Sequence, residues 1–235
     1  MSGRGNWGLA LAGGVAGALL TGLLGVVLAP RLIGENQIRA ALIAHPEILL
    51  EAGTALRDRQ YAPVLAANRI ALETPFGTSW KGAAKPKVIL VEFYDYACGY
   101  CRKSIPDVER LLREDKDLRV VFRELPILGP NSVAAARGAL AASKAGQFTA
   151  YHDLLTVEGS PTPESIAAVS TRLALPPAAA STAEAEAELK HNFQMAGDLG
   201  ATGTPLFVIG NRVINAAPGY ETLKKAVADA RAARS

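Results

Sequence analysis

Cysteine and histidine are both scarce in this sequence: its 235 residues include two cysteines, Cys98 and Cys101, and three histidines. A structural zinc site needs four ligands, usually two pairs of Cys or His residues. The histidines do not supply a second pair, because they are far apart, at His45, His152 and His191. A haem attachment motif needs histidine directly after its second cysteine, and Arg102 stands there. We therefore expect neither kind of metal site, and structural roles for the histidines.

Clustered positive charge is missing as well. The 25 Lys and Arg residues exceed the 22 Asp and Glu residues by three, and they form no basic patch along the chain. Proteins that bind nucleic acid usually carry such a patch, so we expect no nucleic-acid partner. Cysteines for stabilising disulfides are also lacking, but a domain of about 165 residues can bury an adequate core without them.

The two cysteines that are present form a C-x-x-C motif after a predicted buried strand. The strand is indicated by an uninterrupted apolar run, Val88 to Val91. After the motif, apolar residues recur at helical spacing, at Ile105, Val108, Leu111 and Leu112. The pattern therefore predicts a strand-to-helix turn, with Cys98 at the helix N-terminus and Cys101 one turn inside.

This position suits the two cysteines to disulfide exchange. Residues three apart on a helix share a face, close enough for a disulfide. The helix N-terminus favours the thiolate of Cys98, which is the attacking species in disulfide exchange, and Cys101 would resolve the mixed disulfide. The alternative, an inert structural disulfide, gains little chain entropy because the closed loop is so small.

A second motif lies far downstream. Together, FYDYACGYC at 93–101 and GTPLFVIG at 203–210 resemble the DsbA-type thiol-disulfide oxidoreductases, and among them the suppressor-of-copper-sensitivity C proteins. The resemblance covers about residues 69–235, with a weaker likeness in 35–60. It implies an α/β thioredoxin fold with an inserted helical subdomain. It also implies a cis Pro205, preceded by Thr204 and facing the cysteines, and a buried acid at Glu92.

These residues suggest a mechanism. Burial would raise the pKa of Glu92, which could then relay the proton of Cys101; the alternative is a strand carboxylate that points to solvent. Pro205 has no N–H, so the backbone around Thr204 stays open to pair with an extended substrate segment. We expect further residues to line the rim of the site, namely Asp95, Tyr96 and Tyr100.

The direction of the reaction stays open, because oxidase, isomerase and reductase share this arrangement. Gly99-Tyr100 between the cysteines and Thr204 before the proline resemble the isomerase branch. The partners would be cysteine-containing proteins and a membrane redox partner that recycles the pair, with no cofactor. The alternative function is Cu(I) binding in the cell envelope by the same thiolates. Copper chaperones usually place Met two residues before the first cysteine, and Tyr96 is there.

A polar tail, residues 1–6, precedes 23 residues without a charged side chain, Trp7 to Ala29. As a helix these would be roughly 35 Å long, enough to cross a bilayer core. The alternative is a cleaved secretory signal, but its apolar core is typically about 7–15 residues and Val27-Leu28-Ala29 lacks a small-x-small site. We expect a single-pass inner-membrane anchor. The catalytic domain is expected in the periplasm because oxidising chemistry belongs outside the cytoplasm, although the flanking basic residues do not favour that orientation.

Residues 30–61 are predicted to form two short amphipathic helices that meet at Pro46. Their apolar stripe consists of Ile38, Leu42, Ile48, Leu49, Ala52 and Leu56. The resemblance places an oligomerisation segment here, so a homo-oligomer is expected. The alternative is that the stripe packs on the chain's own catalytic domain.

The remaining elements follow from proline, glycine and apolar patterns. Residues 62–85 are expected to form a linker and an edge strand around Ile70 to Thr78, before the thioredoxin domain at 86–235. A sheet strand is expected at 118–125. A helical insert should fill about 131–200, beginning with a helix from Val133 to Ala145 that Asn131 or Ser132 caps and Gly146 ends. The chain would close with a hairpin turning at Gly210-Asn211 and a helix from 219 to 234.

Overall fold

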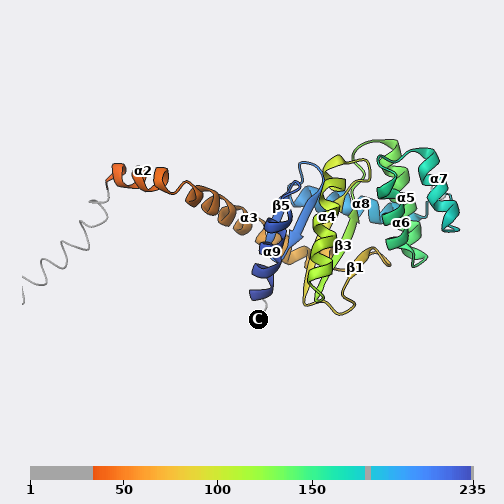
Figure 1. The fold of residues 1–235 in the computed structure, drawn as a ribbon, viewed down its shortest axis with the longest axis horizontal. Coiled ribbons are helices and arrows are strands. Elements are labelled where there is room, and N and C mark those ends of the chain that lie inside the picture. Colours follow the sequence, from red (N-terminus) through yellow and green to blue (C-terminus); the bar gives the residue numbers. More distant parts are fainter. Residues whose placement is uncertain (1–33, 178–180, 234–235) are drawn as a thin grey trace, which may run out of the picture. The chain divides into compact units, whose positions relative to one another are not determined.

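A five-stranded sheet holds the C-x-x-C turn in the computed structural model, which describes residues 34–177 and 181–233 (Figure 1). The strands lie in the order β1-β3-β2-β4-β5. They are β1 (Trp80–Gly82), β2 (Val88–Tyr94), β3 (Leu118–Glu124), β4 (Leu206–Ile209) and β5 (Arg212–Asn215). The central pair, β2 and β3, is parallel, and the other pairs are antiparallel. The predicted buried strand before the cysteines is therefore confirmed as the middle of the sheet.

Helices cover both faces of this sheet. On one face the strand residues Leu90, Val120 and Phe122 share a core with α4 (Gly99–Glu114) and α9 (Tyr220–Ala232), which lie side by side (Figure 1). Both cysteines belong to this core. The other face packs Val91, Phe93 and Val121 against α3 (Glu47–Glu73) and α8 (Ala183–Asp198). Strand residues alternate between the two cores, as the period of two in a strand requires.

The helix α3 corrects one expectation. We expected a short second helix, a linker and a strand around Ile70 to Thr78, but α3 continues through Pro63 to Glu73 and leaves Ile70 83% exposed. An internal proline costs about 3 kcal/mol. Beyond it, Leu65 and Leu72 are fully buried on the sheet, and each contributes about 1.5–3 kcal/mol, which offsets the proline. The edge strand is the later β1.

The chain divides into two compact units, residues 1–55 and 56–235. In the first unit, the described residues form α2 (Glu35–Ala44) and the start of α3. The predicted break before Pro46 is confirmed, because α2 ends at the C-cap His45, whose N–H donates to the carbonyl of Ala41 at 2.9 Å. Large apolar side chains of this unit are exposed, among them Ile38 (52%), Ile43 (70%), Leu49 (59%) and Leu50 (74%).

The predicted helical insert between β3 and β4 is confirmed. The described residues there form α5 (Pro130–Lys144), α6 (Phe148–Val157), α7 (Pro163–Arg172) and α8. The cap predicted at Asn131 or Ser132 is wrong: α5 begins earlier, with Gly129 as N-cap and Pro130 in the first turn, where its missing N–H is not needed. Gly146 follows α5 at φ +76°, the left-handed conformation expected there.

The predicted hairpin near the C-terminus is also present. Ile209 of β4 pairs with Arg212 of β5, which leaves Gly210 and Asn211 as a two-residue turn, and Gly210 adopts φ +56°.

The predicted membrane span, residues 7–29, lies outside the described residues. Within residues 34–177 and 181–233, no helix combines the length and the apolar character that a bilayer crossing requires.

Candidate active site

The two cysteines lie at the start of α4, as the sequence predicts. Cys98 is the N-cap of this helix, and its N–H donates to the carbonyl of Asp95 at 3.0 Å. Cys101 lies in the first helical turn. Both are free thiols, and both are buried, Cys98 at 6% and Cys101 at 4% exposure. The turn therefore presents one sulfur at the helix N-terminus and holds the second beneath it.

The loop before β4 forms one wall of the site. The peptide bond between Thr204 and Pro205 is cis, as expected. The Cys98 thiol donates a hydrogen bond to the Thr204 carbonyl at 3.2 Å, so this loop faces the first cysteine directly. A groove of about 180 Å³ continues from there and is lined by Tyr100, Thr202, Gly203, Thr204, Asn215 and Ala216. Tyr100 is 67% exposed, which agrees with its predicted place at the rim.

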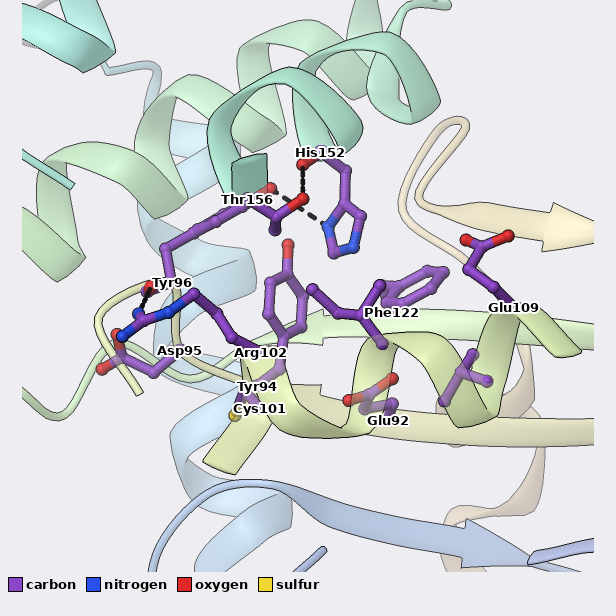
Figure 2. Close-up of a pocket in the computed structure, with 12 residues that line it drawn as sticks. Glu92, Tyr94, Asp95, Tyr96, Cys101, Arg102, Glu109, Phe122, His152 and Thr156 are labelled. Carbon is purple, nitrogen blue, oxygen red and sulfur yellow. Dashed lines mark hydrogen bonds between the residues drawn. The ribbon is translucent and has the colours of Figure 1, made fainter. Parts of the chain in front are cut away.

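Glu92 lies beneath α4 and lines a small cavity that Cys101 also lines (Figure 2). The cavity has a volume of about 10 Å³, close to the smallest space that admits one water molecule. Glu92 is 4% exposed, so the alternative of a strand carboxylate pointing to solvent is wrong. Burial raises the pKa of Glu92 to about 8, opposed in part by the positive charge of Lys81. Burial, and secondly the charge of Glu92, raises the pKa of Cys101 well above its ordinary value.

Lys81 of β1 supplies the positive charge near this cavity, and nothing in the sequence pattern singled it out. It is 9% exposed. Its ammonium group binds Glu109 of α4 at 2.6 Å and also binds Asp153 of α6. These bonds fix a cation between the edge of the sheet and two helices.

The raised pKa of Glu92 makes stability depend on pH. The folded protein holds this proton up to about pH 8, whereas the unfolded chain loses it near pH 4.5. The contribution of protonated Glu92 to the free energy of unfolding is therefore complete below pH 4.5 and is lost as pH rises through 8. The shift corresponds to at most about 5 kcal/mol. Replacing Glu92→Gln should therefore raise Tm relative to the parent at pH 9 and change it little at pH 4. Parallel Tm curves for the two proteins across this range would contradict the assignment.

Two residues predicted at the rim are instead buried. Tyr96, at 3% exposure, packs edge-on against Tyr94 with ring centroids 5.0 Å apart, and its hydroxyl lies 3.4 Å from Nδ1 of His152. Asp95 is 1% exposed. Both residues lie close to the cysteines in sequence, but their side chains point into the protein. Asp95 accepts hydrogen bonds from main-chain N–H groups, and Tyr96 packs in an aromatic cluster.

The histidines are found where structural roles predict. His152 of α6 is buried among aromatic rings: its ring centroid lies 4.8 Å from that of Phe122, which Figure 2 also shows, and 5.5 Å from that of Phe148. Burial lowers its pKa to about 3, so it is neutral at physiological pH. His45 ends α2, and His191 is an exposed residue of α8.

Known proteins share these features. The family described as DSBA-like thioredoxin domain matches residues 89–228. The family described as Copper resistance protein ScsC N-terminal domain matches residues 35–62.

Two solved structures and one sequence relative illustrate the similarity. A periplasmic thioredoxin-like protein from Salmonella enterica serovar Typhimurium is 31% identical, with 70% of this chain and 95% of that chain covered and a TM-score of 0.64. The catalytic domain of Proteus mirabilis ScsC is 27% identical, with 73% and 99% covered and a TM-score of 0.67. The Na(+)/H(+) antiporter NhaA 1 of Salinispora arenicola is 30% identical over 159 residues, which are 64% of this chain and 24% of that protein.

The chain thus spans about a quarter of the length of that curated relative. The match to the DSBA-like domain extends over more than half of the chain and includes the C-x-x-C turn, the cis-proline loop and the strands that carry them. The chain therefore belongs to the DSBA-like thioredoxin domain family of thiol-disulfide oxidoreductases.

Proposed function

We propose that this protein forms and rearranges disulfides in other proteins through Cys98 and Cys101. One observation carries the proposal: Cys98 caps α4 and faces the Thr204 carbonyl at 3.2 Å, while Cys101 is buried one turn further along the same helix. The sulfur at the start of the helix, beside the cis-proline loop, is the one that we expect a substrate to meet first. A buried thiol with a raised pKa is suited to resolving a mixed disulfide rather than starting one.

This geometry suits the oxidation of a substrate dithiol, in which two electrons pass from the substrate to the Cys98–Cys101 disulfide. A substrate thiolate attacks the Cys98 sulfur of the Cys98–Cys101 disulfide, so a mixed disulfide forms and Cys101 leaves as a thiolate that takes a proton. A second substrate thiolate attacks its partner sulfur in the mixed disulfide, and Cys98 leaves as a thiolate. The substrate dithiol is now a disulfide and the cysteine pair is reduced. Rearrangement uses the reverse attack, with Cys98 as the entering thiolate.

Glu92 is suited to move the proton of Cys101. It lines the cavity that Cys101 lines, it is buried, and its pKa of about 8 lies near working pH. A group with that pKa can accept a proton when Cys101 attacks and return it when Cys101 leaves. The positive charge of Lys81 favours the charged form of Glu92, and the charge of Glu92 in turn raises the pKa of Cys101.

A change of Glu92→Gln tests this role. We expect resolution of a Cys98 mixed disulfide by Cys101 to slow by about 10²-fold, because general-base catalysis is lost. In the parent this rate should rise as pH passes through about 8, where Glu92 loses its proton, and the variant should lose this rise. Quenched-flow separation of the mixed disulfide measures the step.

Two controls accompany this experiment. Alkylation of Cys98 by iodoacetamide should persist in Glu92→Gln, and Glu114→Gln, at the far end of α4, should resolve at the parental rate. An unchanged pH profile in Glu92→Gln would leave Glu92 with a structural role only.

Protein substrates would bind along the cis-proline loop. Pro205 cannot donate a hydrogen bond, and an extended substrate chain would pair with the backbone beside Thr204, whose carbonyl accepts the Cys98 thiol in this structure. The groove that begins at Thr204 and includes the exposed Tyr100 supplies adjoining surface. An aromatic ring at the rim suits contact with the apolar residues of unfolded chains.

Rearrangement, rather than simple oxidation, is the direction that we propose. Gly99-Tyr100 and Thr204 support it by resemblance, and so does a segment suited to assembly. Residues 35–62 match the ScsC N-terminal domain, and this segment exposes a row of apolar side chains. An assembly would hold several active sites near one substrate. The equilibrium of the Cys98–Cys101 pair with glutathione tests the direction, because an isomerase needs a substantial reduced fraction at the potential of its compartment.

We also propose a location. The periplasmic origin of the Salmonella relative supports a periplasmic catalytic domain, where disulfides persist. Residues 7–29 would anchor it in the inner membrane, and a membrane redox partner would restore the cysteine pair. Retention of the protein by spheroplasts, with cleavage of its catalytic domain by added protease, distinguishes this arrangement from a soluble periplasmic form, which spheroplasts release.

Copper is the second candidate function. The match of residues 35–62 to a copper resistance protein domain favours it, and two thiolates on one helical turn suit Cu(I). Binding by both sulfurs requires Cys101 to lose its proton, and the raised pKa of Cys101 opposes this. We therefore rank copper binding below disulfide exchange.

A further inference from the structure

Asp95 joins the active-site turn to the loop that follows β3. Its Oδ1 accepts a hydrogen bond from the N–H of Ala97 at 2.8 Å. Its Oδ2 accepts two more, from the N–H groups of Ile127 at 2.8 Å and Leu128 at 2.9 Å. The main-chain carbonyl of Asp95 accepts the N–H of Cys98. One buried residue thus fixes both the cysteine turn and a loop about thirty positions further along the chain.

The loop after β3 is held by hydrogen bonds to Asp95 and exposes two large apolar side chains. Leu125 and Pro126 are buried, and the Leu125 N–H donates to the Tyr94 carbonyl at 2.8 Å. Prolines at both ends of the loop restrict its backbone. Ile127 is 43% exposed and Leu128 is 53% exposed. Neighbouring apolar side chains on a fixed loop are typical of a contact surface.

The topology of the sheet brings this loop to the cysteines. Because β3 runs parallel to β2, the loop after β3 begins at the same end of the sheet as the C-x-x-C turn, which follows β2. The Thr204–Pro205 loop precedes β4, which is antiparallel to β2, so this loop lies at the same end of the sheet. It is on the opposite side of β2 from the loop after β3, because β2 lies between β3 and β4. Cys98 therefore lies between the cis-proline loop and the loop that carries Ile127 and Leu128.

We propose that Asp95 is a positioning residue that holds Ile127 and Leu128 as an apolar wall for the residues flanking the substrate cysteine. The inference rests on the proposed function and adds to it which side chains contact the apolar neighbours of the substrate cysteine, and which residue holds those side chains in place. A preformed wall loses little conformational entropy when a substrate binds. Wall and cis-proline loop then contact opposite sides of the same segment.

The carboxylate is needed for this role. Hydrogen bonds from N–H groups to a charged acceptor are roughly twice as strong as neutral ones. An asparagine at this position has one oxygen for three N–H donors, and its NH₂ group would face another donor. Asp95→Asn therefore keeps the shape of the side chain and releases the loop.

The test compares two short peptides with the reduced full-length protein. Each peptide carries one cysteine in a disulfide with glutathione, flanked by leucines in one peptide and by serines in the other. Two electrons pass from the Cys98–Cys101 dithiol to the peptide disulfide, and stopped-flow detection of the released thiols gives each rate constant. The readout is the ratio of the leucine-peptide rate to the serine-peptide rate.

We expect the double change Ile127→Ser and Leu128→Ser to lower this ratio by about 10–100-fold, the effect of losing apolar contacts in a pocket. Asp95→Asn should lower it similarly, and combining all three changes should lower it no further. Asp115→Asn is the matched control, because Asp115 also accepts an N–H bond two residues ahead, from Asp117 at 3.1 Å, and it should keep the parental ratio.

Two results would overturn the inference. One is a parental ratio in the Ile127→Ser and Leu128→Ser protein, whose surface changes leave the fold intact. The other is a full additional loss when Asp95→Asn is added to that protein, because Asp95 would then act by another route. If the parent fails to reduce either peptide, the proposed function itself is wrong, and this outcome is distinct from a change of ratio.

Discussion

Replacing Cys98→Ser should abolish disulfide exchange. Cys98 is the sulfur at the helix N-terminus and beside the cis-proline loop, so no other group in the described structure can start the reaction there. Cys101 cannot substitute for it, because it lies one turn further into the helix and its pKa is raised well above the ordinary value. We expect the rate of insulin reduction to fall to that of the uncatalysed reaction. A coupled assay with a chemical reductant measures it.

Cys101→Ser is the matched variant and should behave differently. Cys98 can still attack a substrate, but nothing resolves the product, so mixed disulfides should accumulate and appear as higher-mass bands on non-reducing gels. If both variants exchange disulfides as fast as the parent, the redox function is wrong.

Removing the N-terminal segment should separate two activities. We expect a protein that begins at residue 56 to oxidise a dithiol peptide nearly as fast as the parent, because the whole active site lies in the second compact unit. Isomerisation of scrambled ribonuclease should fall by about 10²-fold or more, since several linked sites raise the effective concentration of the attacking thiol. The cut at this boundary keeps the part of α3 that packs on the sheet through Leu65 and Leu72.

A point variant tests whether assembly is the cause. Leu49→Asp changes an exposed apolar residue of the predicted stripe, and Glu51→Gln changes a neighbouring exposed polar residue of the same helix. Light scattering on proteins that begin at residue 30 should find an oligomer for the parent and for Glu51→Gln, and a monomer for Leu49→Asp. A monomeric parent, or isomerisation that survives the truncation, would exclude the role of this segment.

Local patterns predicted much of the fold. The apolar run at Val88, the glycine at Gly146 and the Gly210-Asn211 turn each specify their own geometry, and the structure has them where expected. The predicted linker and strand around Ile70 to Thr78 were wrong, because the conformation of this segment depends on distant contacts. A proline at position 63 and β-branched Ile70 favour a break and a strand, but burial of Leu65 and Leu72 against the sheet outweighs them.

The site shows the same division. The cysteine turn follows from the local sequence pattern, whereas the cis proline and the burial of Glu92 were implied by the family resemblance. Side-chain direction did not follow: Asp95 and Tyr96 turn inward because their partners, Leu128 and His152, come from later parts of the chain. Lys81 was missed because its role arises from Glu109 and Asp153, which are 28 and 72 positions away. One sequence signal for Asp95 was available: an aspartate in a turn often accepts a hydrogen bond from the backbone N–H two residues ahead, which here belongs to Ala97.

The position of Trp80 has a practical consequence for spectroscopy. This residue lies on the edge strand β1, with the guanidinium of Arg119 4.3 Å above its ring, and it packs with the core on the sheet face opposite the cysteines. In a protein that begins at residue 56 it is the sole indole, because the other tryptophan of the chain is Trp7. Its emission should therefore report unfolding of the sheet edge and respond little to the oxidation state of the C-x-x-C pair. Redox titrations of that protein need a thiol-specific readout such as mass labelling.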